Sequence, residues 1–84
     1  MTPNEAKIVR FMERRGKPIT ANQLANQFSQ TLGYVDFLLR SLMRQMLLEK
    51  DRLHYRMTKT ALDELAKFDL GYKYEAFEGK EESW

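Results

Sequence analysis

The sequence of 84 residues contains no cysteine and only one histidine, and these absences exclude several kinds of site. Without cysteine the chain cannot form disulfides, thiolate zinc sites or a cysteine nucleophile. The single histidine, His54, cannot complete a histidine-based metal site within one chain. We therefore expect no bound metal and no cofactor, and we expect His54 to be an exposed strand residue.

Long apolar runs are also missing from the sequence. No segment approaches the roughly 20 apolar residues that a transmembrane helix needs, and the first residues lack the basic and apolar regions of a secretion signal. The sequence has no glycine-rich phosphate loop and no nucleophile elbow, and its acidic residues cluster near the end of the chain. We therefore expect one small cytoplasmic domain that is not an enzyme.

Charge is distributed unevenly along the chain. Residues 1–59 carry eleven basic and five acidic side chains, a formal charge of +6. Residues 60–84 carry three basic and seven acidic side chains, a formal charge of −4. A basic body with an acidic end is typical of a nucleic-acid binder whose tail faces elsewhere, and an uneven but merely solvated surface is the alternative.

Capping residues predict where the first three helices begin. Thr2 and Thr20 are each followed three residues later by Glu or Gln, the spacing of a capping box. The first helix is expected to end at Gly16, because glycine adopts the left-handed conformation without a steric penalty. An extended connector over 17–19 leads to the second helix, which is short. Thr31 is expected to cap the third helix.

Apolar spacing predicts which face of each helix is buried. The i, i+3, i+4 pattern of a helix indicates buried stripes in the first three helices, formed by Ile8, Val9, Phe11 and Met12, by Leu24, Ala25 and Phe28, and by Val35, Leu38, Leu39, Leu42, Met43 and Met46. The third helix is therefore expected to span 31–46. In the fourth helix, which Thr58 caps, the expected inner residues are Leu62, Leu65 and Ala66.

A period of two between the third and fourth helices predicts a small β-hairpin over 47–57. Its turn is expected at 50–52, with Arg52 at the tip, and Leu53, Tyr55 and Met57 alternate with polar residues after the turn. The fourth helix is expected to end near Asp69, so we assign 1–69 to the domain and 70–84 to an acidic aromatic tail. This tail either packs on the first or fourth helix, crosses to a second subunit, or is disordered beyond Gly79.

The order of these elements, together with several sequence fragments, resembles a winged helix-turn-helix. Residues 19–25 resemble the start of the second helix of bacterial and archaeal winged-helix regulators, and 35–42 resemble the apolar skeleton of their recognition helix. Residues 46–49 and 55–61 are similar to the two ends of the wing. The closest groups are the antibiotic-resistance, arsenic-sensing and PadR-like regulators. The family usually has glycine at Met46 and often at Ala61, and this chain departs from it there.

The resemblance implies a mainly α fold with a three-helix core, a short wing and a fourth helix. It also implies a transcriptional regulator that binds double-stranded DNA, with the helix 31–46 in the major groove and the wing 47–57 on the backbone. The DNA-binding residues that it indicates, by position, are Thr31, Tyr34, Arg40, Arg44, Lys50, Arg52 and Arg56. Because such regulators commonly dimerise through their terminal elements, we also expect a homodimer.

Other residues of the third helix favour a different function. Asp36 places a negative charge where DNA phosphates would approach, and Leu32, Tyr34 and Phe37 are more apolar than a groove surface requires. They are consistent with a winged helix that binds a protein partner through these three residues without binding DNA. Two further readings stay open: Tyr34 and Phe37 pack against the second helix, or Arg40 and Arg44 are ordinary solvated positions.

Overall fold

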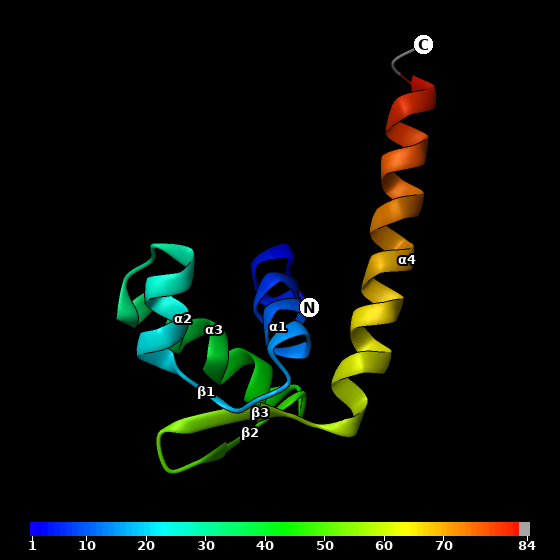
Figure 1. The fold of residues 1–84 in the computed structure, drawn as a ribbon. Helices are drawn as coiled ribbons and strands as arrows, with labels where there is room; N and C mark the ends of the chain where they lie inside the picture. Colours follow the sequence, from blue (N-terminus) through cyan, green and yellow to red (C-terminus); the bar gives the residue numbers. More distant parts are fainter. Residues whose placement is uncertain (83–84) are drawn as a thin grey trace.

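The computed structural model describes the backbone of residues 1–82 and the side chains of residues 1–71. This part of the chain is mainly helical, with one small antiparallel sheet (Figure 1). Its elements, in chain order, are α1 (Pro3–Arg15), β1 (Ile19–Thr20), α2 (Ala21–Phe28), α3 (Leu32–Arg44), β2 (Leu48–Asp51), β3 (His54–Met57) and α4 (Lys59–Glu82). The layout is compatible with a winged-helix-like fold.

The predicted helix starts are confirmed at the first three helices. At α1 the Thr2 Oγ1 atom accepts a hydrogen bond from the Glu5 amide at 3.2 Å, and the Thr2 amide donates to Glu5 Oε1 at 2.8 Å. The same reciprocal pair links Thr20 and Gln23 at α2. Thr31 caps α3 through its hydroxyl. These local hydrogen bonds satisfy amide groups that no helical carbonyl can reach.

The hairpin is part of a three-stranded sheet with the order β1-β3-β2. Residues 17–19 were expected to be only a connector, but Ile19 and Thr20 pair with Tyr55 and His54 of β3. The hairpin turn lies at Arg52 and Leu53, whereas it was expected at 50–52. Arg52 has a left-handed backbone with φ 58°, and Leu53, which was expected to take part in the alternation after the turn, lies in the turn itself and is 72% exposed.

The core lies between α1, α2, α3 and the inner face of the sheet. Its largest fully buried side chains include Met12, Leu24, Leu39 and Leu42. Phe11 and Phe28 pack at its edge with their rings 5.6 Å apart in an edge-to-face arrangement. Other predicted inner positions of the third helix are wrong: Met43 is exposed at 36% and Met46, which lies beyond the end of α3, at 75%.

Glu5 joins the start of α1 to the end of α3. Its side chain is only 3% exposed and accepts hydrogen bonds from the Thr2 amide and from Gln45 Nε2 at 3.3 Å. Burial raises the pKa of Glu5, but hydrogen bonds from Ser41, Thr2 and Gln45 favour the charged carboxylate more strongly, so the pKa lies below its ordinary value. The carboxylate therefore stabilises the packing of α1 on α3 in its ionised form.

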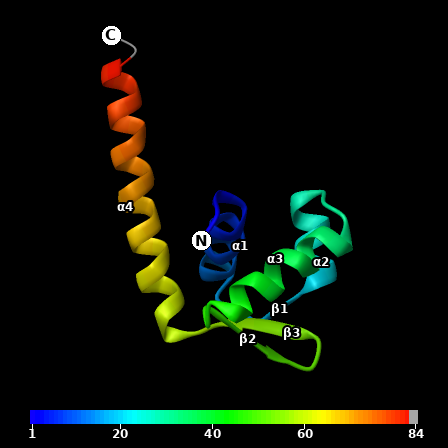
Figure 2. The ribbon, with the colours of Figure 1, turned by 180° about the vertical axis from the view of Figure 1, so that it is seen from behind.

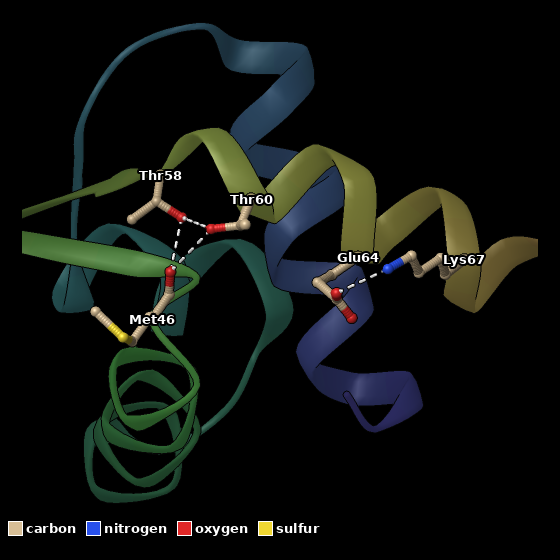
Figure 3. Close-up of polar contacts among 5 residues, drawn as sticks. All are labelled: Met46, Thr58, Thr60, Glu64 and Lys67. Carbon is tan, nitrogen blue, oxygen red and sulfur yellow. Dashed lines mark hydrogen bonds and ion pairs between the residues drawn. The ribbon is translucent and has the colours of Figure 1, made fainter.

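The turn after α3 fastens the sheet to α4 (Figure 3). Met46 has a left-handed backbone with φ 61°, and its carbonyl accepts hydrogen bonds from the hydroxyls of Thr58 at 2.8 Å and Thr60 at 3.4 Å. Thr58 precedes α4 as predicted, but its hydroxyl is engaged with this carbonyl. Met46 thus occupies the turn at which the winged helix-turn-helix family, which the sequence resembles, usually has glycine.

Helix α4 is longer than the sequence pattern indicates. It continues to Glu82 instead of ending near Asp69, and it extends past the rest of the molecule (Figures 1 and 2). Gly71 does not stop the helix, and neither proline of the chain lies in this segment. The expected packing of the aromatic side chains in the tail falls outside the described side chains. Arg10 of α1 donates a hydrogen bond to Asp69, which fastens α4 to α1.

The buried face of α4 also differs from the prediction. Ala61 and Leu65 are buried, and Phe68 packs at the edge of the core. Leu62 is 44% exposed and Ala66 is exposed, so two of the three predicted inner residues are wrong. The predicted and the observed inner residues both have helical spacing. The contacts of α4 with α1 and the sheet decide which of these residues face inward.

Candidate nucleic-acid interface

Helix α3 has one buried face and one exposed face. Val35, Leu38, Leu39 and Leu42 point into the core. With 3.6 residues per turn, the opposite side is formed by the exposed residues that we call the α3 ridge, namely Gly33, Phe37, Arg40 and Arg44. Phe37 is 61% exposed and therefore does not pack against α2 as core.

An ion pair on α3 alters the electrostatic picture that the sequence suggests. Arg40 Nε lies 2.9 Å from Asp36 Oδ2, one helical turn away, and the Arg40 side chain is 72% exposed. The negative charge of Asp36 is thus balanced by its neighbour. Exposed pairs of this kind are worth about 0.3–0.5 kcal/mol, so a phosphate or a base edge can compete for the guanidinium.

The strand register separates the basic residues of the hairpin onto two faces. Lys50 pairs with Tyr55 and its Nζ atom lies 5.3 Å from the centre of that ring. Arg56 pairs with Glu49 on the other face, where its Nε atom lies 3.0 Å from Glu49 Oε2. Successive side chains of a strand point to opposite faces. The structure therefore does not bring Arg56 together with Lys50.

A groove of about 440 Å³ separates α3 from the hairpin. It has Lys50 on one wall and Asp36 on the other, and apolar atoms of Leu32, Leu53 and Tyr55 line it between them. Thr20, Ala21 and Asn22 also line it. Lys50 is thus the hairpin cation on the same side as α3. Leu53 was not among the binding residues predicted from the sequence, because it was assigned to the alternating strand after the turn.

Thr31 and Tyr34 lie at the N-terminal end of α3. The Thr31 hydroxyl accepts from the Tyr34 amide at 3.2 Å, and the Tyr34 hydroxyl accepts from Asn4 Nδ2 of α1 at 2.6 Å. Both residues are exposed. The hydroxyl hydrogen of each remains able to donate, and the positive end of the helix favours an anion here.

Two predicted arginines have no internal partner among residues 1–71. Arg44 lies on the α3 ridge and Arg52 lies at the hairpin tip, and neither forms an ion pair with a side chain in this range. Together with Arg40 and Lys50 they are four of the five cations on α3 and the hairpin. Arg56 instead lies beside Lys17 and Pro18, near the end of α1.

The apolar residues of α3 do not form one patch. Leu32 faces the groove, Phe37 lies on the α3 ridge, and Tyr34 is tied to α1. Phe37 follows Leu32 by five positions, which places the two side chains roughly 140° apart around the helix axis. A protein partner would therefore have to wrap around α3 to contact all three.

Two general properties complete the description of this surface. Among the helices that the structure describes, none has the length and apolar character needed to cross a membrane. No group of three His, Cys, Asp or Glu side chains among those described could hold a metal ion.

In comparisons with known proteins, no protein-family model matches this sequence, and neither a curated protein nor a solved structure shows significant similarity to it.

Proposed function

We propose that this chain is a small winged helix-turn-helix protein that binds double-stranded DNA and regulates transcription. In this proposal α3 enters the major groove and the β2–β3 hairpin contacts the backbone as the wing. The observation that carries it is the α3 ridge, where Arg40 and Arg44 project away from the core on one helix face. We propose no catalytic activity and no cofactor.

The positions of the remaining cations support the same arrangement. Lys50 and Arg52 lie on the hairpin, and Thr31 and Tyr34 lie where the N-terminal end of α3 would approach a phosphate. Arg56 lies on the other face of the hairpin, paired with Glu49. It would therefore contact DNA only if the backbone passed around the edge of the hairpin.

Duplex binding measured against salt concentration tests this proposal. Each neutralised phosphate contributes about −0.9 to the slope of log K against log salt. We expect Arg44→Ala and Arg52→Ala each to reduce the slope by about one and to weaken binding to all duplexes. Lys67→Ala is the matched control, because Lys67 is an exposed cation on α4 that pairs with Glu64.

Two results would count against DNA binding. The first is the absence of any binding to duplex DNA at low salt. The second is an equal loss of affinity in Lys67→Ala and in the two arginine variants, since binding would then follow net charge alone. The alternative function is that of a protein-interaction module, and the exposure of Phe37 supports it. It would be favoured if the chain bound no duplex and captured a protein partner in a way that depends on Phe37.

We also propose that the protein is a homodimer that associates through α4. The helix has 24 residues and is about 36 Å long, so it extends past α1, the helix on which it packs (Figure 1). Leu62, Ala66 and Leu70 lie at i, i+4 and i+8 on one face, and Leu62 and Leu70 are 44% and 69% exposed. Sedimentation equilibrium of the wild type should give twice the monomer mass. The double variant with Leu62→Glu and Leu70→Glu should give the mass of one monomer. A monomeric wild type at micromolar concentration would contradict this.

A further inference from the structure

Phe37 is the most exposed aromatic side chain that the structure describes. Its ring is 61% exposed, whereas Phe11 and Phe28 pack against each other at the edge of the core and Tyr55 is buried. Phenyl rings gain more than most side chains from leaving water. A phenyl group held out on the α3 ridge is therefore suited to contact an apolar group on a partner.

The neighbours of Phe37 define what that partner group must look like. Arg40 follows Phe37 by three residues and Arg44 by seven, so Phe37 has guanidinium groups on its C-terminal side. Gly33 precedes it by one turn, and a Cβ at Gly33 would meet no atom within 4 Å beyond its chain neighbours and the backbone of its own helix. The ridge is thus open at one end and cationic at the other, with a single apolar group between.

The major groove of DNA offers a matching surface. The C5-methyl group of thymine is an apolar group among polar base edges, and guanine presents O6 and N7 to an arginine. Side chains at i and i+3 of a helix have Cβ atoms about 5–6 Å apart, and stacked bases are about 3.4 Å apart along a strand. Two such side chains therefore reach bases that are adjacent or two steps apart.

We infer that Phe37 is a specificity-determining residue that contacts the methyl group of a thymine within about two base pairs of a guanine bound by Arg40. This inference rests on the proposed function, because it requires α3 in the major groove. The helix itself sets the spacing of the two contacts, because Arg40 follows Phe37 by three residues, and the weak exposed pair with Asp36 leaves the guanidinium able to exchange to a base edge.

Replacement of thymine by deoxyuridine tests the inference, because it removes only the methyl group. A duplex is first selected with the full chain from a random-sequence library, and each thymine is then replaced in turn. At one position we expect the affinity to fall about fourfold, the value for one buried methyl-sized group. In Phe37→Ala the thymine and deoxyuridine duplexes should bind equally. Arg40→Ala should bind more weakly but keep the fourfold ratio.

The outcomes separate this inference from the function on which it rests. Failure of the wild type to bind any duplex refutes the proposed function, and the inference with it. Duplex binding with no position sensitive to deoxyuridine refutes the inference alone, as does a ratio that persists in Phe37→Ala. Phe37→Ser is a second variant for the same comparison, and circular dichroism confirms that each variant folds.

Discussion

Replacing Met46 by glycine should make the protein more stable. Met46 adopts a left-handed backbone with φ 61°, and its side chain is 75% exposed. That conformation costs a residue with a Cβ about 1–2 kcal/mol. Glycine removes this cost but loses about 0.4–1 kcal/mol through the larger entropy of its unfolded chain. We therefore expect Met46→Gly to raise the free energy of unfolding by about 0.5–1 kcal/mol.

The hydrogen bonds of this turn support the estimate. Thr58 and Thr60 donate to the Met46 carbonyl (Figure 3). The Met46 amide donates to the Met43 carbonyl at 2.9 Å. All of them use the Met46 backbone and remain when its side chain is lost. The substitution thus changes the conformational preference of one residue and removes little buried surface.

Urea titration followed by circular dichroism measures the difference, and thermal melting gives a second reading. For a domain of this size, 0.5–1 kcal/mol corresponds to an increase in Tm of about 2–8 °C. Met46→Ala is the matched control, because it shortens the side chain but keeps the Cβ, and it should not stabilise. Equal stability of Met46→Gly and Met46→Ala, or a loss in Met46→Gly, would refute the reasoning.

Five further substitutions test three other features of the fold. Glu5→Gln should lower the free energy of unfolding by about 1 kcal/mol at pH 7. Because folding lowers the pKa of Glu5, the stability that the carboxylate contributes is present above the ordinary glutamate pKa and is lost as the pH falls. Urea titrations should therefore show that the stability difference between wild type and Glu5→Gln shrinks below about pH 4. Gly33→Ala should stabilise by about 0.5–1 kcal/mol because a methyl group has free space there, whereas Gly16→Ala, at φ 68°, should destabilise by a similar amount in the same titration. At concentrations at which the chain is monomeric, Leu65→Ala should cost about 2–5 kcal/mol and Leu62→Ala less than about 1 kcal/mol. The reverse order would show that α4 packs on the domain through its other face.

The candidate interface was predictable only in part. A helix with buried residues at 35, 38, 39 and 42 must expose 40 and 44, so the positions of Arg40 and Arg44 follow from the period of the helix. Phe37 was left open between the core and the surface, because the period of the helix does not tell whether a neighbouring element such as α2 covers an aromatic side chain on the outer face. The separation of Arg56 from Lys50 depends on the register of β2 with β3, which capping and period alone leave undetermined.

The sequence by itself determined where the first three helices begin and that a hairpin follows α3. Those features depend on contacts within four residues, such as Thr2 with Glu5, or on a simple alternation of side chains. Only the tertiary structure decided that Ile19 and Thr20 join the sheet, since two residues form a strand only when a neighbouring strand supplies the hydrogen bonds. It also decided that Ala61 and Leu65, rather than Leu62 and Ala66, face inward, because both pairs have the same spacing and only the elements packed against α4 distinguish them.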